Sequence, residues 1–318
     1  MSETQYLSGW RYRAVTLSAG AAALGYLGFS LWVGWQDVSS AIVKVGLPGI
    51  VIAMLMSLIN YSVRFLRWQI YLNKLGHPLP TQPSFKMYLA GFALTTTPGR
   101  AGEALRGVLF KQWGVPYPKS FAAYFSERLS DLLAIALLTL LGLSLYPDAK
   151  AMILVGFGMV LVGLVALSQR RLIERLVRFI PESYGKATRL AKHLNHILTE
   201  AQRCHSPGMF LLAALLGVLA CSSEALAFYW ILSWIGADVP LTFAVFVYAL
   251  SILAGALSFM PGGLGGTEAV MATLLIWKGV PHADAIAAVV LIRLCTLWFS
   301  VGVGMIALTK TRHLAPNK

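Results

Sequence analysis

The sequence predicts an all-α polytopic membrane protein, built from inverted structural repeats with two broken or re-entrant helical segments. Three observations predict this fold. The 318 residues are 57% hydrophobic and only 12% charged, whereas soluble domains carry roughly a quarter charged residues. Apolar runs recur at the length of a bilayer crossing. Glycine and proline also interrupt apolar sequence at corresponding places in the two halves of the chain.

The apolar runs are taken in chain order, with roughly 20 residues required for each crossing. They predict membrane helices near 15–34, 45–63, 129–146, 150–168, 209–234 and 283–309. We expect the first to be a retained helix, because its length exceeds that of a signal-peptide core. Two further apolar regions, about 84–112 and 243–278, are interrupted. Irregular backbone is tolerated at membrane depth only inside protein or beside a wet cavity. These regions are therefore expected to be re-entrant hairpins or pairs of broken helices.

The interrupted regions are two copies of one pattern. From Glu103 and from Glu268 onward, both copies keep the same spacing to a Gly-Val-Pro triplet and then to an arginine, Arg128 or Arg293. The repeats predict a single membrane domain over 1–318 in which the chain divides as follows: 1–44 with the first helix, 45–147 as repeat 1, 148–206 as a helix plus an amphipathic cytoplasmic connector, 207–310 as repeat 2, and 311–318 as a basic tail.

The basic residues predict the orientation. Most of them cluster at 11–13, 64–86, 170–203 and 310–318. We expect the chain to lie in the cytoplasmic (inner) membrane, and the positive-inside rule then places both termini in the cytoplasm. In this orientation the two repeats are inverted relative to each other. The net charge of +13 favours contact with anionic membrane lipids. The sequence has no motif for nucleic acid, and its scattered cysteines and histidines predict neither a metal site nor another cofactor.

Ionisable residues inside predicted membrane segments are the candidate functional residues. Each costs at least roughly 2.5 to 3.5 kcal/mol at the bilayer centre unless it is paired or used. The sequence places ten there: Arg100, Glu103, Arg106, Glu127, Arg128, Asp131, Glu224, Glu268, Asp284 and Arg293. Such a number is unusual for a purely structural bundle.

The first motif has features that suit an anion. Pro98-Gly99 ends one helix and leaves the N–H groups of the next helix free. Arg100 adds a forked donor that suits phosphate. Arg100, Glu103 and Arg106 are spaced by three and share a helix face. Arg100 and Arg106 either contact a substrate or neutralise nearby carboxylates.

The equal spacing of Glu103/Arg128 and Glu268/Arg293 predicts two ion pairs, one in each repeat, which are either braces or parts of the substrate site. The second motif offers bare backbone for a substrate or a gate at Gly262, Gly263, Gly265 and Gly266. Three carboxylates are candidates for proton coupling: Glu127, Asp131 and Glu224. For each of them the alternative is a salt bridge or a hydrogen bond to neighbours.

Broken segments in both halves of a membrane protein predict a central binding site and transport. At these residues the chain resembles the lysylphosphatidylglycerol synthase transmembrane-region family of flippase-like membrane proteins. The resemblance rests on PGRAGEALR at 98–106, SERLSD at 126–131, PGGLGGTEAV at 261–270 and Arg293. It implies movement of a phosphate-bearing lipid between leaflets. Because the sequence up to Lys318 has no cytoplasmic synthase domain, aminoacylation is not expected.

Two alternatives remain at this stage. One is a membrane-embedded lipid or glycan transferase that uses a carboxylate as a base, although no catalytic motif is found. The other is a non-transporting partner of such a synthase.

Overall fold

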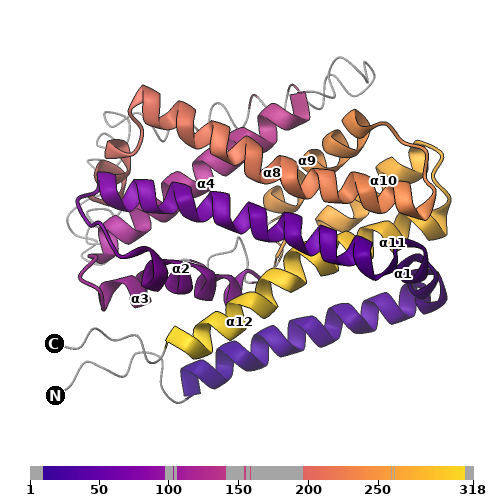
Figure 1. Ribbon diagram of the computed structural model, residues 1–318, viewed down its shortest axis with the longest axis horizontal. Helices are drawn as coiled ribbons and strands as arrows, with labels where there is room; N and C mark the ends of the chain where they lie inside the picture. The colour runs from indigo at the N-terminus through magenta and orange to yellow at the C-terminus, as the bar shows by residue number, and fades with distance from the viewer. Residues whose placement is uncertain are drawn as a thin grey trace, which may run out of the picture.

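The computed structural model describes residues 10–96, 103, 106–140, 154, 158, 196–258, 260 and 262–311. Within these ranges, side chains are described from Val38 onward. Within these residues every regular element is helical (Figure 1). Three helical stretches of the described part are long and apolar enough to cross a membrane: Val38–Lys74, Pro207–Ile235 and His282–Thr311. The predicted all-α membrane fold is therefore confirmed.

Helix α1 (Trp10–Lys74) has 65 residues, which would span roughly 100 Å if it were straight. Instead its ribbon doubles back on itself (Figure 1). Gly46 has a φ of 66°, and Pro48 removes a backbone donor within the helix. The predicted helices 15–34 and 45–63 are thus two limbs of α1.

The second limb of α1 continues to Lys74. The prediction that ended this helix before Arg64 and Arg67 is wrong, and the cytoplasmic side predicted for them stays a prediction. Both side chains are buried, because carboxylates of one other helix, Tyr117–Leu140, neutralise them inside the protein. Hydropathy predicts that the helix ends at its first charged residue. In the folded chain the helix continues, because a buried charge is tolerated when it has a partner of opposite sign.

The rest of the first half contains α2 (Thr81–Ala90), the 3₁₀ helix η1 (Gly91–Leu94), α3 (Arg106–Lys111) and α4 (Tyr117–Leu140). The predicted start of α4 near 129 is wrong, because the helix begins at Tyr117. The charged side chains in its first half are neutralised by ion pairs inside the protein. Pro98, Gly99, Arg100 and Gly102 lie outside the described residues. So do the predicted helix at 150–168, apart from Leu154 and Gly158, and most of the connector at 170–203, of which 196–203 are helical.

The second half repeats this order of elements: α8 (Pro207–Ile235), α9 (Leu241–Leu257), α10 (Gly266–Trp277), α11 (His282–Arg293), the π-helix η4 (Leu294–Trp298) and α12 (Phe299–Thr311). Matching glycines have positive φ at the same turns. Gly76 and Gly236 have φ of 77° and 97°, and Gly114 and Gly279 have φ of 82° and 93°. The copies in the sequence therefore share local backbone structure.

The two halves are interlocked rather than side by side. Helix α12 packs on α2, and the corresponding helix α4 of the first half packs on α9. The second limb of α1 and α8 are antiparallel, because Met56 bonds to Ser223, Asn60 to Ala220 and Arg67 to Ala213 (Figure 1). This exchange of packing partners supports the predicted repeats, and their inverted relation stays a prediction.

One close approach depends on a glycine. A Cβ on Gly304 of α12 would lie 2.2 Å from the backbone nitrogen of Ala93 in η1. Backbone atoms at that distance cannot move away as the end of a side chain can. Gly304 therefore lets the last helix of the second half contact the segment that leads into the first broken motif.

We expect Gly304→Ala to lower the free energy of unfolding by about 1 to 3 kcal/mol, because the methyl group forces α12 away from η1. Gly302→Ala is the matched control on the same helix, since a Cβ there meets nothing within 4 Å. Thermal unfolding of the purified variants in detergent measures both. Equal melting temperatures for the two variants would contradict this packing.

A buried charge network beside a central cavity

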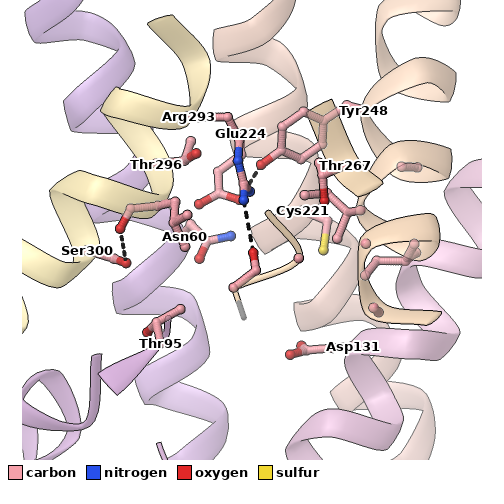
Figure 2. Close-up of a pocket in the computed structure, with 18 of the residues that line it drawn as sticks. Asn60, Thr95, Asp131, Cys221, Glu224, Tyr248, Thr267, Arg293, Thr296 and Ser300 are labelled. Carbon is pink, nitrogen blue, oxygen red and sulfur yellow. Dashed lines mark hydrogen bonds between the residues drawn. The ribbon is translucent and has the colours of Figure 1, made fainter. Parts of the chain in front are cut away.

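A cavity of about 350 Å³ lies between the two halves of the chain (Figure 2). Its walls come from α1, η1, α4, α8, α9, α11, η4, α12 and both broken motifs. Apolar side chains such as Leu132, Ile135 and Ile252 line part of it. Among the described residues, the arginines and acidic residues that line it are Arg64, Glu103, Arg128, Asp131, Glu224 and Arg293. The cavity thus combines apolar walls with charges from both repeats.

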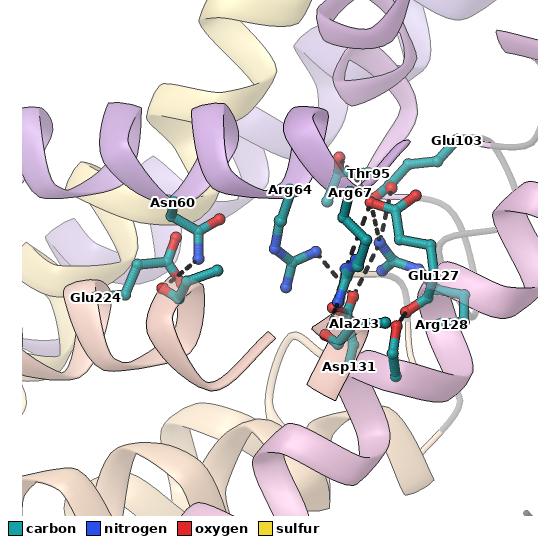
Figure 3. A network of polar contacts seen from close by, with 12 residues as sticks. Asn60, Arg64, Arg67, Thr95, Glu103, Glu127, Arg128, Asp131, Ala213 and Glu224 are labelled. Atoms are coloured by element: carbon teal, nitrogen blue, oxygen red, sulfur yellow. Dashed lines mark hydrogen bonds and ion pairs between the residues drawn. The ribbon is translucent and has the colours of Figure 1, made fainter. Parts of the chain in front are cut away.

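One wall includes part of an arginine cluster, defined here by its ion pairs as Arg64, Arg67, Glu103, Arg106, Glu127, Arg128 and Asp131. Figure 3 labels all of these residues except Arg106. Asp131 of α4 is central to it. Its carboxylate lies 2.9 Å from Arg64 Nη1, 2.5 Å from Arg67 Nη2 and 3.2 Å from Arg128 Nη2. The cluster ties the second limb of α1 to α4 through charge-assisted bonds, which are stronger than neutral ones.

Arg106 and Glu127 lie behind the cavity wall. Arg106 Nη2 is 2.7 Å from Glu127 Oε2, and Tyr88 donates to the other oxygen of Glu127. The guanidinium of Arg106 also stacks 4.4 Å from the ring centre of Trp68 and 4.6 Å from that of Tyr88. Arg106 thus neutralises Glu127, and its contact with a substrate stays a prediction.

Glu103 and Arg128 form the ion pair that their spacing predicts, at 3.5 Å. Glu103 also lies 3.7 Å from Arg106 and accepts a hydrogen bond from Thr95. Arg128 reaches the cavity with 20% of its side chain exposed. Its Nε and Nη2 atoms are buried and have no hydrogen-bond partner among the described residues. Arg128 is therefore a guanidinium held by charge rather than by well-aligned hydrogen bonds.

The second predicted pair is tighter. Arg293 Nε lies 2.6 Å from Glu268 Oε1, and Arg293 Nη2 donates to the carbonyl oxygen of Gly262 at 2.9 Å. Glu268 Oε2 in turn accepts from the backbone N–H of Gly265 at 2.7 Å. Gly262, Gly263 and Gly265 have φ of 62°, 68° and 85°. This pair therefore holds a turn that only glycines adopt readily.

The glycines of the second motif do not all face the cavity. Gly262 and Gly263 line it, whereas Gly265 and Gly266 do not. A Cβ on Gly262 would lie 3.5 Å from the Cα of Thr96, and one on Gly266 would lie 3.1 Å from the Ser258 hydroxyl. The second motif thus meets the chain that leads into the first motif.

The three carboxylates expected to couple protons have different surroundings. Glu127 and Asp131 are each ion-paired with arginines. Glu224 of α8 lines the cavity and accepts a hydrogen bond of 2.7 Å from the Tyr248 hydroxyl (Figure 2). Asp284 lies away from the cavity in an exposed pair with Lys44 at 3.2 Å.

The sequence reasoning missed two arginines of the site, Arg64 and Arg67. They are three residues apart at the end of an apolar helix, and the carboxylates of Glu127 and Asp131 are one turn apart on another. Two such pairs of opposite sign are complementary. The sequence therefore contained enough information to predict that Arg64 and Arg67 pair with these carboxylates. No pattern in the sequence predicts that Asn60 and Tyr248 line the cavity.

The structure thus defines a helical multi-pass membrane protein with an internal cavity lined by charges. The chain belongs to the family described as the lysylphosphatidylglycerol synthase TM region, whose family model matches residues 15–304. This confirms the resemblance seen in the motifs.

Curated relatives are similar along most of their length. A UPF0104 membrane protein of Methanothermobacter thermautotrophicus is 23% identical, over 93% of this chain and 94% of the relative. A second from the same organism is 26% identical, over 88% of each chain. A UPF0104 membrane protein of Pyrococcus horikoshii is 23% identical, over 89% of this chain and 93% of the relative.

Glu127→Gln is expected to lower the free energy of unfolding by about 3 to 5 kcal/mol, because it leaves the guanidinium of Arg106 buried without its main counter-charge. Adding Arg106→Gln should recover part of the loss. Thermal unfolding in detergent measures the single variants and the pair. The prediction fails if the double variant is no more stable than Glu127→Gln alone.

Proposed function

We propose that this protein moves a phosphate-bearing amphiphile, such as a phospholipid or a polyprenyl-phosphate lipid, across the cytoplasmic membrane. The observation that carries the proposal is the cavity between the two repeats, which Arg128 lines with a partly exposed side chain. A guanidinium binds phosphate through two parallel hydrogen bonds. The family name, which refers to the membrane region of a lipid synthase, agrees with a substrate of this kind.

A headgroup needs such a site because its charge is costly in hydrocarbon. The arginines and carboxylates around the cavity replace the water that the headgroup loses. The apolar lining at Leu132, Ile135 and Ile252 suits the adjoining part of a lipid chain. Arg100, which the sequence nominates for phosphate, lies outside the described residues and stays part of this proposal.

Alternating access would use the second motif as its moving part. The Arg293 bond to the Gly262 carbonyl holds the glycine turn against Thr96. When that bond breaks, a turn with four glycines can change its backbone conformation at low cost. The inner-membrane location, the cytoplasmic termini and a supplying lipid- or glycan-synthesis enzyme belong to the same proposal.

Arg128→Ala should slow lipid movement about tenfold or more, because a lost charge-assisted hydrogen bond of about 1.5 kcal/mol corresponds to a factor near ten. Arg128→Lys should restore only part of the rate, since an ammonium lacks the fork. Fluorescent phospholipids in vesicles that contain only this protein report the rate, as an impermeant quencher removes the outer-leaflet signal.

Arg203→Ala is the matched control, because Arg203 is exposed and pairs with Glu200 away from the cavity. It should move lipid at the wild-type rate. A folded Arg128→Ala protein as active as wild type would remove Arg128 from the site. Vesicles in which the wild-type protein moves no lipid would contradict the proposed function.

A further inference from the structure

We infer that a lipid enters the cavity sideways from the membrane hydrocarbon, through an opening at the C-terminal end of α9. The opening is defined by Ala256, Leu257 and Met260. The headgroup passes into the cavity, while the acyl chains stay in the membrane. This inference rests on the proposed function, and it gives that function a route and the residues that form it.

The three residues of the opening are exposed and also line the cavity. Leu257 and Met260 are 50% and 47% exposed, and Ala256 is exposed as well. Each of the other described residues that line the cavity is buried or half-buried. Among the residues that the structure describes, the cavity therefore reaches the surface at this end of α9.

The opening lies at the depth of the membrane hydrocarbon. Helix α9 is apolar and follows a connection in which Asp238 is exposed. A charged and exposed residue of this kind marks the polar face of a membrane. The 17 residues of α9 rise about 25 Å, whereas the hydrocarbon core is roughly 30 Å thick. The end of α9 thus stops short of the opposite face.

An apolar track on α9 joins the opening to the interior of the cavity. Ala249, Ile252 and Ala256 recur at helical spacing on one face of the helix, and all three line the cavity. Exposure rises along this track, since Ala249 is buried, Ile252 is half-buried and Ala256 is exposed. A hydrocarbon chain that leaves the cavity along the track meets apolar atoms all the way to the surface.

Helix α4 gives the same cavity a charged end and an apolar end. Arg128 is followed one and two turns later by Leu132 and Ile135, and all three residues line the cavity. A headgroup beside Arg128 therefore has its first chain atoms against apolar side chains. The cavity volume of about 350 Å³ is at the lower end of the roughly 300 to 1,000 Å³ of small-ligand pockets. It suits a headgroup and not two acyl chains, so the chains need an apolar way out.

The first copy is closed at the corresponding place. Thr95 and Thr96 follow the end of η1 there, and both are buried. Helix α12 covers this segment, with Gly304 against Ala93. Threonine hydroxyls are also less suited to hydrocarbon than the apolar side chains of the opening. Of the two copies, the second therefore has both the exposure and the side chains for contact with lipid chains.

The opening is connected to the glycine turn of the second motif. The N–H of Gly263 donates to the carbonyl oxygen of Met260 at 2.9 Å, and a Cβ on Gly265 would lie 3.4 Å from Met260 Cε. The bond from Arg293 to the Gly262 carbonyl holds the same turn. A change in the backbone of the turn therefore moves Met260 at the rim of the opening.

Tryptophan substitutions at the opening test the route. Leu257→Trp and Met260→Trp place a bulky ring where the headgroup enters, so each should slow lipid movement about tenfold in vesicles that contain only the full-length protein. Leu219→Trp is the matched control, because Leu219 of α8 is 55% exposed and does not line the cavity. It should move lipid at the wild-type rate. Melting temperatures establish that all variants are folded.

A second measurement detects entry without requiring transport. Cys221 lines the cavity, whereas the other two cysteines, Cys204 and Cys295, do not. Phosphatidylethanolamine with a maleimide on its amine should attach to Cys221 of the wild type, which peptide mass spectrometry detects. Leu257→Trp should slow this attachment about tenfold, and Leu219→Trp should not. N-Ethylmaleimide, a small reagent, measures the reactivity of Cys221 in each variant.

The outcomes separate the route from the proposed function. Attachment or lipid movement at wild-type rates in both folded tryptophan variants would overturn the route and leave transport standing. A wild-type Cys221 that the maleimide lipid never reaches would overturn the route as well, whatever its reactivity toward N-ethylmaleimide. Attachment that the tryptophans block, in vesicles where the wild type moves no lipid, would support the route and overturn transport. Neither attachment nor movement would overturn both.

Discussion

The structure depends on the mutual neutralisation of arginines and carboxylates between α1 and α4. Asp131 accepts contacts from Arg64, Arg67 and Arg128, and none of these charges would be tolerated singly in an apolar interior. Their pairing fixes the second limb of α1 against α4. Because Arg64, Arg128 and Asp131 also line the cavity, the same contacts that hold the helices together set its electrostatic character.

The two repeats use one pair of residues in different ways. Arg293 is bonded to Glu268 and to a backbone carbonyl of the glycine turn, so its role in this state is to hold the second motif. Arg128 is shared among three carboxylates at 3.2 to 3.6 Å, and its side chain is partly exposed where it lines the cavity. Arginines at equivalent positions of the two copies thus have different partners, a single carboxylate and a carbonyl for Arg293 and three carboxylates for Arg128.

Much of the architecture was predictable because membrane-length apolar runs and Gly/Pro breaks are local signals. The helices at 209–234 and 283–309 and both Glu/Arg pairs are where the spacing placed them. The errors share one cause. The prediction ended the second helix before Arg64 and began α4 near 129, because hydropathy counts a charge as exposed. Whether a charge is buried depends on a partner far along the chain.

The sequence by itself determined the membrane class, the family, the order of the two copies and the paired residues within each copy. These properties follow from composition and from spacings along one segment. Only the tertiary structure decided that Arg64 joins Asp131, that Arg106 is stacked behind the wall, and that Glu224 faces the same cavity as Arg128. Each of these contacts joins different helices, and no spacing along the chain encodes how two helices approach each other.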